Sequence, residues 1–84
     1  METKKSNIKL DSNDFIAFEL TESEIGLTNL TDLKGLIEKE ISSGNINIAI
    51  DLKNVLVINS SGLGILIGCM KRVKNANGIF KILN

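Results

Sequence analysis

The 84-residue sequence contains no histidine, no proline and only one cysteine, Cys69. Without histidine, His-based acid–base catalysis, Ser/His/Asp triads, Cys/His pairs and the usual zinc sites lack their essential groups. A single cysteine excludes a disulfide within the chain, and its place in the apolar run 64–70 (GILIGCM) indicates a buried thiol. We therefore expect no catalytic residue, no metal, no cofactor and a reducing, cytoplasmic environment.

Excess charge of one sign is also missing, because ten basic and ten acidic side chains cancel. This balance argues against a broad electrostatic footprint for nucleic acid or for an anionic membrane. The two halves differ, since residues 1–42 carry nine acids and five bases, whereas residues 43–84 carry five bases and one acid, Asp51. The asymmetry indicates either solvated faces and helix-terminus effects or a charged docking surface.

Long hydrophobic runs are absent as well. The longest apolar stretch, Gly62–Met70, has nine residues, about half the length that crosses a bilayer. Residues 1–10 lack the apolar core of a secretory signal, so we expect no membrane insertion. No repeat or linker composition interrupts the chain, which predicts a single domain over residues 6–84 with residues 1–5 as a loose tail.

The N-terminal half has the pattern of a hairpin followed by a helix. Ile8–Leu10 and Phe15–Leu20 are short apolar segments separated by residues 11–14, a cluster of aspartate, serine and asparagine that favours a turn. From Leu27 onward, apolar residues recur with the spacing of one helix face. Their positions are 30, 33, 36, 37 and 41.

This first helix has candidate caps at both ends. Thr28 or Asn29 can cap its start, and Gly44-Asn45 can end it. The next segment, Ile46–Leu52, alternates apolar and other residues with the two-residue period of a strand.

The C-terminal part predicts a second helix between two apolar segments. Val55–Ile58 leads into small polar residues, a helical pattern continues through Lys74, Asn77-Gly78 breaks it, and Ile79–Leu83 has the pattern of a strand. The predicted order is ββαβαβ, with the two later strands each reached by a helical crossover. The fold class is therefore α/β, a small mixed β-sheet with helices packed against it.

Residues 55–70 (VLVINSSGLGILIGCM) are the most informative segment, because a strand passes through small polar residues and glycines directly into a helix. Unpaired N–H groups at such a helix start favour an anion. A dinucleotide-binding loop does not fit, because Gly68 lies one residue beyond the required register after Gly62 and Gly64, and no acid follows about twenty residues later. A Walker loop fails because no glycine is followed by lysine and a hydroxyl residue.

Two interpretations of the helix start remain open. Ser60 or Ser61 can be a phosphate acceptor, because a phosphate there would meet unpaired N–H donors. Alternatively, Asn59 or one of the serines only caps the helix, and the glycines let it lie close against the sheet. Two glycines in a first turn cost about 1 kcal/mol each relative to alanine, so either close packing or a bound partner should offset that cost.

Three neighbouring apolar residues, Leu63, Ile65 and Leu66, cannot all face one core stripe. At least one is therefore expected to point outward, as an interaction surface requires.

The stretch from Ile48 to Asn84 resembles the core of a STAS domain, the family of bacterial anti-sigma factor antagonists. The family pattern is a strand ending in Asp-Leu, a short apolar segment, then Asp-Ser-Ser-Gly-Leu-Gly opening a helix with a basic end, and a glycine before the next strand. The matching residues are Asp51-Leu52, Ser60-Ser61-Gly62-Leu63-Gly64, Lys71-Arg72 and Gly78.

The resemblance implies a non-catalytic regulatory switch. In the family, the first serine of the pair is phosphorylated by an anti-sigma factor that is also a serine kinase, and the unmodified domain binds that factor. By position, Ser60 would be the phosphate acceptor. The implied partner contacts are Asn59, Ser61, Gly62, Leu63 and Leu66.

Two departures from the family pattern affect these expectations. Asn59 replaces the usual acid, which preserves a helix cap but removes a fixed charge beside the acceptor. Family domains also usually continue beyond the strand equivalent to Ile79–Leu83, whereas this sequence ends at Asn84 and so appears short at the C-terminus. An uncovered apolar face is the expected consequence, with self-association or low stability.

Three functional hypotheses follow. The first is the antagonist switched at Ser60 by an anti-sigma factor serine kinase. The second is a STAS module that is never phosphorylated and serves as an accessory or structural subunit of a larger signalling or transport assembly. The third is weak nucleotide turnover at the helix start, for which no catalytic base is evident.

Overall fold

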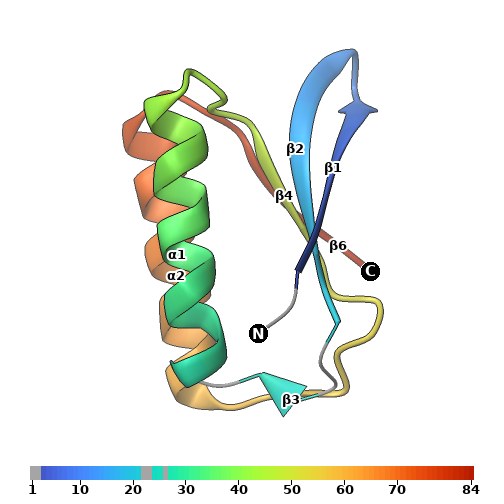
Figure 1. Cartoon of the computed structure of the whole chain (residues 1–84), viewed down its shortest axis with the longest axis vertical. Coiled ribbons are helices and arrows are strands. Elements are labelled where there is room, and N and C mark those ends of the chain that lie inside the picture. Colours follow the sequence, from blue (N-terminus) through green and yellow to red (C-terminus); the bar gives the residue numbers. More distant parts are fainter. Residues whose placement is uncertain (1–2, 22–23, 26) are drawn as a thin grey trace.

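A computed structural model describes residues 3–21, 24–25 and 27–84, in which two helices cover one face of a four-stranded sheet (Figure 1). The sheet order is β1-β2-β4-β6, and β3 pairs with β5 as a separate two-stranded ribbon. The mixed α/β class is confirmed. The elements are β1 (Thr3–Leu10), β2 (Asn13–Leu20), β3 (Glu24–Ile25), α1 (Leu27–Ser42), β4 (Ile48–Asp51), β5 (Val57–Ile58), α2 (Ser60–Asn75) and β6 (Phe80–Leu83).

The strands of the hairpin are longer, and its turn is shorter, than the apolar segments Ile8–Leu10 and Phe15–Leu20 indicate. β1 and β2 are antiparallel from Thr3 opposite Leu20 to the turn, where Asp11 and Ser12 have φ values of 50° and 68°. Two successive positive φ angles give a turn whose twist matches the strands it joins. The expectation of a loose tail is wrong for residues 3–5, because the register set by the turn extends pairing to the end of β2. Residues 1–2 lie outside the described part of the chain.

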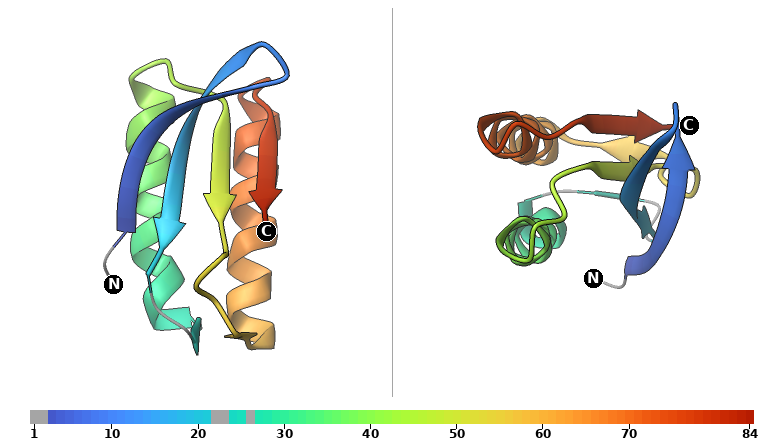
Figure 2. Two further views of the ribbon diagram at one scale, coloured as in Figure 1. Left: turned by 90° about the vertical axis from the view of Figure 1, so that its right-hand side faces the viewer. Right: turned by 90° about the horizontal axis from the view of Figure 1, so that it is seen from above.

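In the four-stranded sheet, β4 and β6 run parallel to β2, and α1 and α2 provide the two crossovers on the same side of the sheet (Figure 2). Alternation along β4 directs Ile48 and Ile50 toward the helices, where both are fully buried. The main core lies between the sheet and the helices. It contains Phe18, Leu20, Leu30, Leu33, Ile37, Ile48, Ile50, Leu66, Cys69 and Val73.

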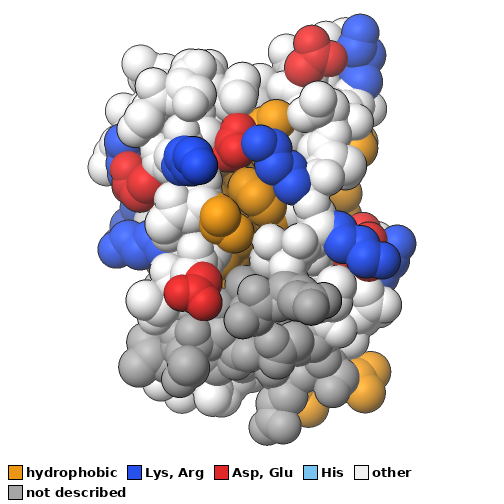
Figure 3. All heavy atoms as spheres, viewed as in Figure 1, with side chains coloured by type: hydrophobic (Ala, Val, Ile, Leu, Met, Phe, Trp, Pro, Cys, Tyr) orange, Lys and Arg blue, Asp and Glu red, His pale blue; other side chains and the backbone are white. Residues whose placement is uncertain are grey.

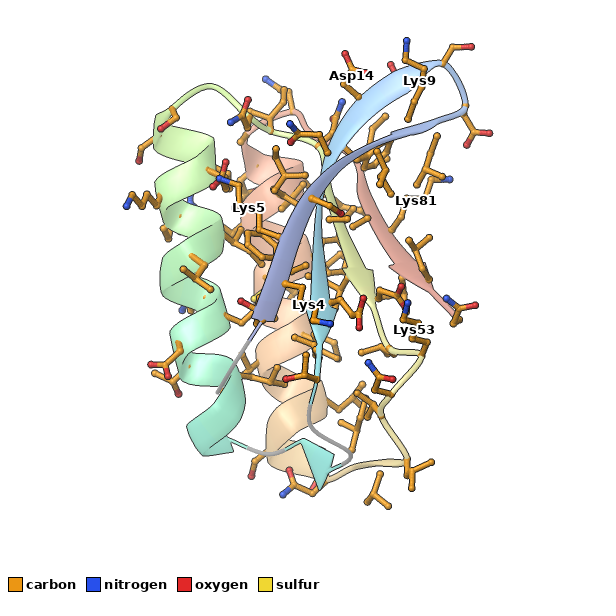
Figure 4. The ribbon with its side chains drawn as sticks, turned by 45° about the vertical axis from the view of Figure 1, so that its right-hand side comes forward. Lys4, Lys5, Lys9, Asp14, Lys53 and Lys81 are labelled. Carbon is orange, nitrogen blue, oxygen red and sulfur yellow. The ribbon has the colours of Figure 1, made fainter. Side chains whose placement is uncertain are left out.

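The outer face of the sheet, opposite the helices, is covered by the β1–β2 hairpin. Phe15 and Ala49 are buried there, with Ile8 of β1 and Leu83 of β6 packed beside them. The hairpin curls across the sheet until its turn approaches β6, and Lys81 reaches toward it (Figure 4). The Lys81 Nζ lies 3.4 Å from an Asp11 carboxylate oxygen.

Several apolar side chains at the β6 side of the described structure are exposed. Ile79 and Ile82 remain 38% and 47% exposed beside β6 and on it. On α2, Ile67 remains 42% exposed.

The ends of α1 agree with the predicted caps only in part. The helix begins at Leu27, so Thr28 and Asn29 lie inside its first turn, and their side chains are outside the described part of the chain. At the other end, Gly44 has φ +93°, and the Asn45 N–H donates to the Glu40 carbonyl at 2.9 Å. A left-handed glycine with such a bond is a common helix C-terminus, so the prediction for Gly44-Asn45 is confirmed.

The turn between α2 and β6 requires a glycine for space. A Cβ added to Gly78 would lie 1.8 Å from the Ile46 carbonyl oxygen.

No helix within the described ranges is long and apolar enough to cross a membrane.

Candidate functional site

Asn59 defines the start of α2. Its backbone is extended, and its side-chain Oδ1 accepts a hydrogen bond from the Gly62 N–H at 2.8 Å. The Asn59 carbonyl also accepts from the Leu63 N–H at 3.0 Å. These two bonds are those of an N-cap residue, so Asn59 rather than either serine caps the helix.

Ser60 and Ser61 follow the cap as the first two residues of α2, and both are exposed. Because Asn59 provides the cap, neither hydroxyl is required for helix formation. The N–H groups of a first turn have no partner within the helix, and the first turn of α2 contains no acidic residue. A phosphate on Ser60 would thus be the first negative charge at the positive end of the helix dipole.

Exposed apolar side chains flank Ser60 on both sides in the sequence. Leu56 is 83% exposed, Val57 is 53% exposed and Leu63 is 52% exposed. Figure 3 shows hydrophobic side chains projecting at the lower right of the molecule, the end at which the segment between β4 and α2 runs. Along the chain, the serine pair therefore lies between exposed apolar side chains of the kind that protein contacts use.

Leu56 and Val57 were not among the predicted contact residues. Their apolar run, Val55–Ile58, predicted a strand that leads into the helix. Of this run, Val57 and Ile58 form β5, which pairs with the short β3 in the described part of the chain. Sequence alone contains no signal for this exposure, because an apolar run has the same composition whether or not another layer covers it.

Two of the predicted contact residues are inaccessible. Leu66 is only 6% exposed, since it lies on the same helix stripe as Cys69 and Val73 and faces the core. Gly62 is buried at the first turn, where Asn59 binds its N–H. Leu66 therefore cannot contact a partner, whereas Leu63 points outward as expected for one member of the apolar trio.

The later glycines of α2 do not serve close packing. A Cβ added to Gly64 or to Gly68 would meet nothing within 4 Å. Both residues lie on the helix face away from the sheet, one and two turns after Ser60. The proposed offset by close packing is thus wrong for these two positions.

The described residues offer little for catalysis. Cys69 is fully buried, and burial raises the pKa of its thiol, which disfavours the reactive thiolate. Within the described ranges, no group of three or more Cys, Asp or Glu side chains is placed to hold a metal ion. The site is an exposed hydroxyl pair on a capped helix, surrounded by apolar and small residues.

No protein-family model and no curated protein matches the sequence. Solved structures do match it. The structure of the anti-sigma factor antagonist SpoIIAA in its unphosphorylated form superposes with a TM-score of 0.76 at 18% identity, over 99% of this chain and 73% of that chain. The fold is that of a STAS domain.

Two further structures support the STAS fold. The NMR structure of the protein TM1081 matches with a TM-score of 0.71 at 21% identity, over 90% of this chain and 59% of that chain. The crystal structure of Mglu matches with a TM-score of 0.71 at 11% identity, over 83% of this chain and 17% of that chain. At these identities the similarity establishes the fold, and any function must be argued from the residues.

Proposed function

We propose that this STAS domain is a non-catalytic anti-sigma factor antagonist that binds an anti-sigma factor kinase through the start of α2 and is switched by phosphorylation of Ser60. The observation that carries the proposal is the exposed Ser60 at the first position of α2, beside exposed Leu63 and next to a cap supplied by Asn59. The structural similarity to SpoIIAA, an antagonist described in an unphosphorylated form, supports it.

The separation of cap and acceptor makes the modification compatible with the fold. Since Asn59 holds the Gly62 N–H, a phosphate on Ser60 breaks no bond that starts the helix. It adds about 1.5 to 2 negative charges at a surface built from apolar side chains. In a desolvated contact this charge loses hydration, and a net penalty of about 2.8 kcal/mol weakens binding 100-fold.

The glycine face of α2 supports protein contact at the same place. Gly64 is exposed and lies one turn beyond Ser60, with no neighbour that its missing side chain accommodates. Glycine in a helix costs up to about 1 kcal/mol relative to alanine. A partner backbone that lies against this turn accounts for a glycine at this position.

A second candidate is a STAS module that is not phosphorylated and acts within a larger assembly. Asn59 favours it, because no acid stands beside the acceptor and the first turn of α2 has none. The match to Mglu also shows this fold as a small part of a longer chain. In this alternative the surface around Ser60 still binds protein, but it has no switch.

Phosphorylation is tested with a purified serine-kinase anti-sigma factor from the same genome and ATP. We expect intact-protein and peptide mass spectrometry to show one phosphate on Ser60. Ser60→Ala should abolish the modification, whereas the matched Ser61→Ala should retain it. Modification at neither serine contradicts the switch.

Binding separates the two candidates. By calorimetry with the same anti-sigma factor, Ser60→Asp should weaken binding by one to two orders of magnitude, because it places a charge in the apolar contact. Ser60→Ala should bind like the unmodified protein. Equal binding by the aspartate and alanine variants contradicts the switch and favours the accessory module.

A further inference from the structure

The pair Asn77-Gly78 forms the turn that leads from the end of α2 into β6 (Figure 2), and it is the one Asn-Gly pair in the sequence. Nothing in the proposed function uses it. An asparagine followed by glycine can rearrange without an enzyme, because the glycine nitrogen can reach the Cγ atom of the asparagine and no Cβ on the glycine hinders the approach. The pair is therefore a candidate site of spontaneous covalent modification.

The reaction consumes one water molecule and releases one ammonia. The Gly78 nitrogen loses its proton and forms a bond to Cγ of Asn77, and the Cγ–Nδ2 bond breaks as Nδ2 leaves as ammonia. Water then opens the five-membered imide at one of its two carbonyl groups. One product is aspartate at position 77. The other is isoaspartate, in which the main chain runs through Cβ and Cγ and is longer by one carbon atom.

The folded turn blocks the first step of this reaction. The Gly78 N–H donates to the Val73 carbonyl at 3.0 Å, and the Asn77 N–H donates to the Lys74 carbonyl at 2.9 Å. With Asn77 at φ 66°, these two bonds form a common motif of helix C-termini. The proton that must leave is held by the helix, so the turn has to open before the nitrogen can attack.

The same turn has no room for a longer main chain. The Ile79 N–H donates to Asn47 Oδ1 at 3.0 Å, and the Ile79 carbonyl accepts a bond from β4 at 2.9 Å, so β6 is fixed one residue after Gly78. A Cβ added to Gly78 would lie 1.8 Å from the Ile46 carbonyl oxygen. An additional main-chain carbon at position 77 would therefore separate Gly78 from the end of α2 or displace β6 from β4.

The two products differ in how they affect the turn. Both add a carboxylate at the C-terminal end of α2, where the helix dipole disfavours negative charge. Aspartate keeps the ordinary chain length and accepts a left-handed backbone much as asparagine does. Isoaspartate combines the charge with the longer chain, so it prevents the turn from closing as described.

We propose that Asn77-Gly78 is a site of spontaneous isomerisation that the folded turn keeps closed. Each opening of the turn allows the reaction, and isoaspartate then keeps the end of α2 and β6 from returning to their folded arrangement. The modification thus marks chains that have opened at this turn. It involves neither Ser60 nor the residues beside it.

The test incubates the full chain in neutral buffer and, in parallel, in guanidinium chloride at the same pH. Trypsin cleaves after Lys74 and Lys81 and releases residues 75–81 (NANGIFK), which contain the site and a matched control, Asn75 followed by alanine. We expect fragment mass spectrometry to show a gain of one dalton at Asn77 at least tenfold faster in guanidinium chloride than in buffer. Asn75 should remain unchanged over the same period.

Hydrogen exchange connects the modification to opening of the turn. The Gly78 N–H should exchange more slowly in the folded protein than in the unfolded chain, by a factor within about threefold of the ratio of the two modification rates, because both rates follow the open fraction. Equal modification rates in buffer and in guanidinium chloride overturn the proposal. So does the absence of modification in both.

Variants separate the effect of charge from that of chain length. Asn77→Gly removes the reacting amide and keeps a residue suited to positive φ, so it should abolish the mass gain without lowering the urea midpoint. The isoaspartate protein, separated by chromatography, should unfold at a lower urea concentration than Asn77→Asp, which has the charge without the longer chain. Equal midpoints overturn the proposal. Phosphorylation of Ser60 is measured independently, so the proposed function and this inference can fail separately.

Discussion

Asn59 and Ser60 are adjacent, yet they have separate tasks at the start of α2. The Asn59 side chain binds the Gly62 N–H at 2.8 Å and closes the first turn. Ser60 is exposed and supplies no cap. Chemistry at the hydroxyl can therefore change without loss of the helix, which is what a modification site requires.

Substitution of Asn59 should reveal this division of tasks. Asn59→Ala should lower the free energy of unfolding by about 1 kcal/mol, because the Gly62 N–H loses its acceptor. Asn59→Asp should retain most of that stability, since aspartate caps about as well. Urea unfolding measures both.

Ser60→Ala is the matched control for the cap. It should change the unfolding free energy by less than about 0.5 kcal/mol, as is usual for surface changes away from special features. A loss at Ser60→Ala as large as at Asn59→Ala would show that the serine, rather than the asparagine, supports the helix start.

At the scale of elements, α2 presents three distinct faces. One stripe, Leu66, Cys69 and Val73, is buried against the sheet. Arg72 links the helix to Glu38 of α1. A Cβ added to Gly64 would meet nothing within 4 Å in the described part of the chain, so packing within the domain does not explain a glycine at this position.

Replacing Gly64 should therefore stabilise the protein and impair binding. Gly64→Ala should raise the unfolding free energy by up to about 1 kcal/mol, because alanine restricts the unfolded chain and favours a helix. The same variant should weaken binding to the anti-sigma factor, since the added methyl group keeps a partner backbone from the first turns of α2. Unchanged binding would remove Gly64 from the contact.

Gly78→Ala provides the contrast. Its Cβ would lie 1.8 Å from the Ile46 carbonyl oxygen, so the turn between α2 and β6 must move. This variant should be clearly less stable than the wild type in the same urea experiment. Equal effects of alanine at positions 64 and 78 would contradict the packing described here.

For the whole molecule, different elements cover the two faces of the four-stranded sheet. The helices cover one face, and the curled hairpin covers the other. An ion pair joins the layers at the β1 edge, where Lys5 Nζ lies 2.6 Å from a Glu40 carboxylate oxygen (Figure 4 shows Lys5 extending toward α1). Asn45 Nδ2 donates to the other Glu40 oxygen at 3.0 Å.

The Lys5–Glu40 ion pair should make the free energy of unfolding depend on pH. Hydrogen bonds from Lys5 and then from Asn45 hold the pKa of Glu40 below its ordinary value, despite burial that acts to raise it. The carboxylate thus contributes stability above the ordinary glutamate pKa of about 4.3, and this contribution is lost as pH falls through the lowered pKa.

Glu40→Gln isolates that contribution. The urea midpoint of the wild type should exceed that of the variant at pH 7, and the difference should shrink below about pH 4 as the carboxylate is protonated. Lys5→Met removes the cation that pairs with Glu40, so it should reduce the same pH dependence. A difference that is constant from pH 7 to pH 3 would show that Glu40 contributes only by packing.

Some features of the fold are predicted by the sequence, and others are not. The alternation over Ile46–Leu52 predicted the central strand, and the glycine at position 44 predicted the end of α1 with its positive φ. Leu66 was placed in the partner contact, yet it is buried, because a neighbour in sequence lies a third of a turn away on a helix. Residues 3–5 were placed in a tail because β pairing of polar residues leaves no periodic apolar signal.

The sequence by itself determined the elements and the chemistry of the helix start, because periodicity, capping and turn residues act over a few neighbouring positions. It also determined that histidine and disulfide chemistry are excluded. Only the tertiary structure decided which apolar residues are covered, since burial depends on what other elements place against them. The burial of Leu66, the exposure of Leu56 and the packing of the hairpin over the outer face all depend on how segments distant in the sequence are arranged in space.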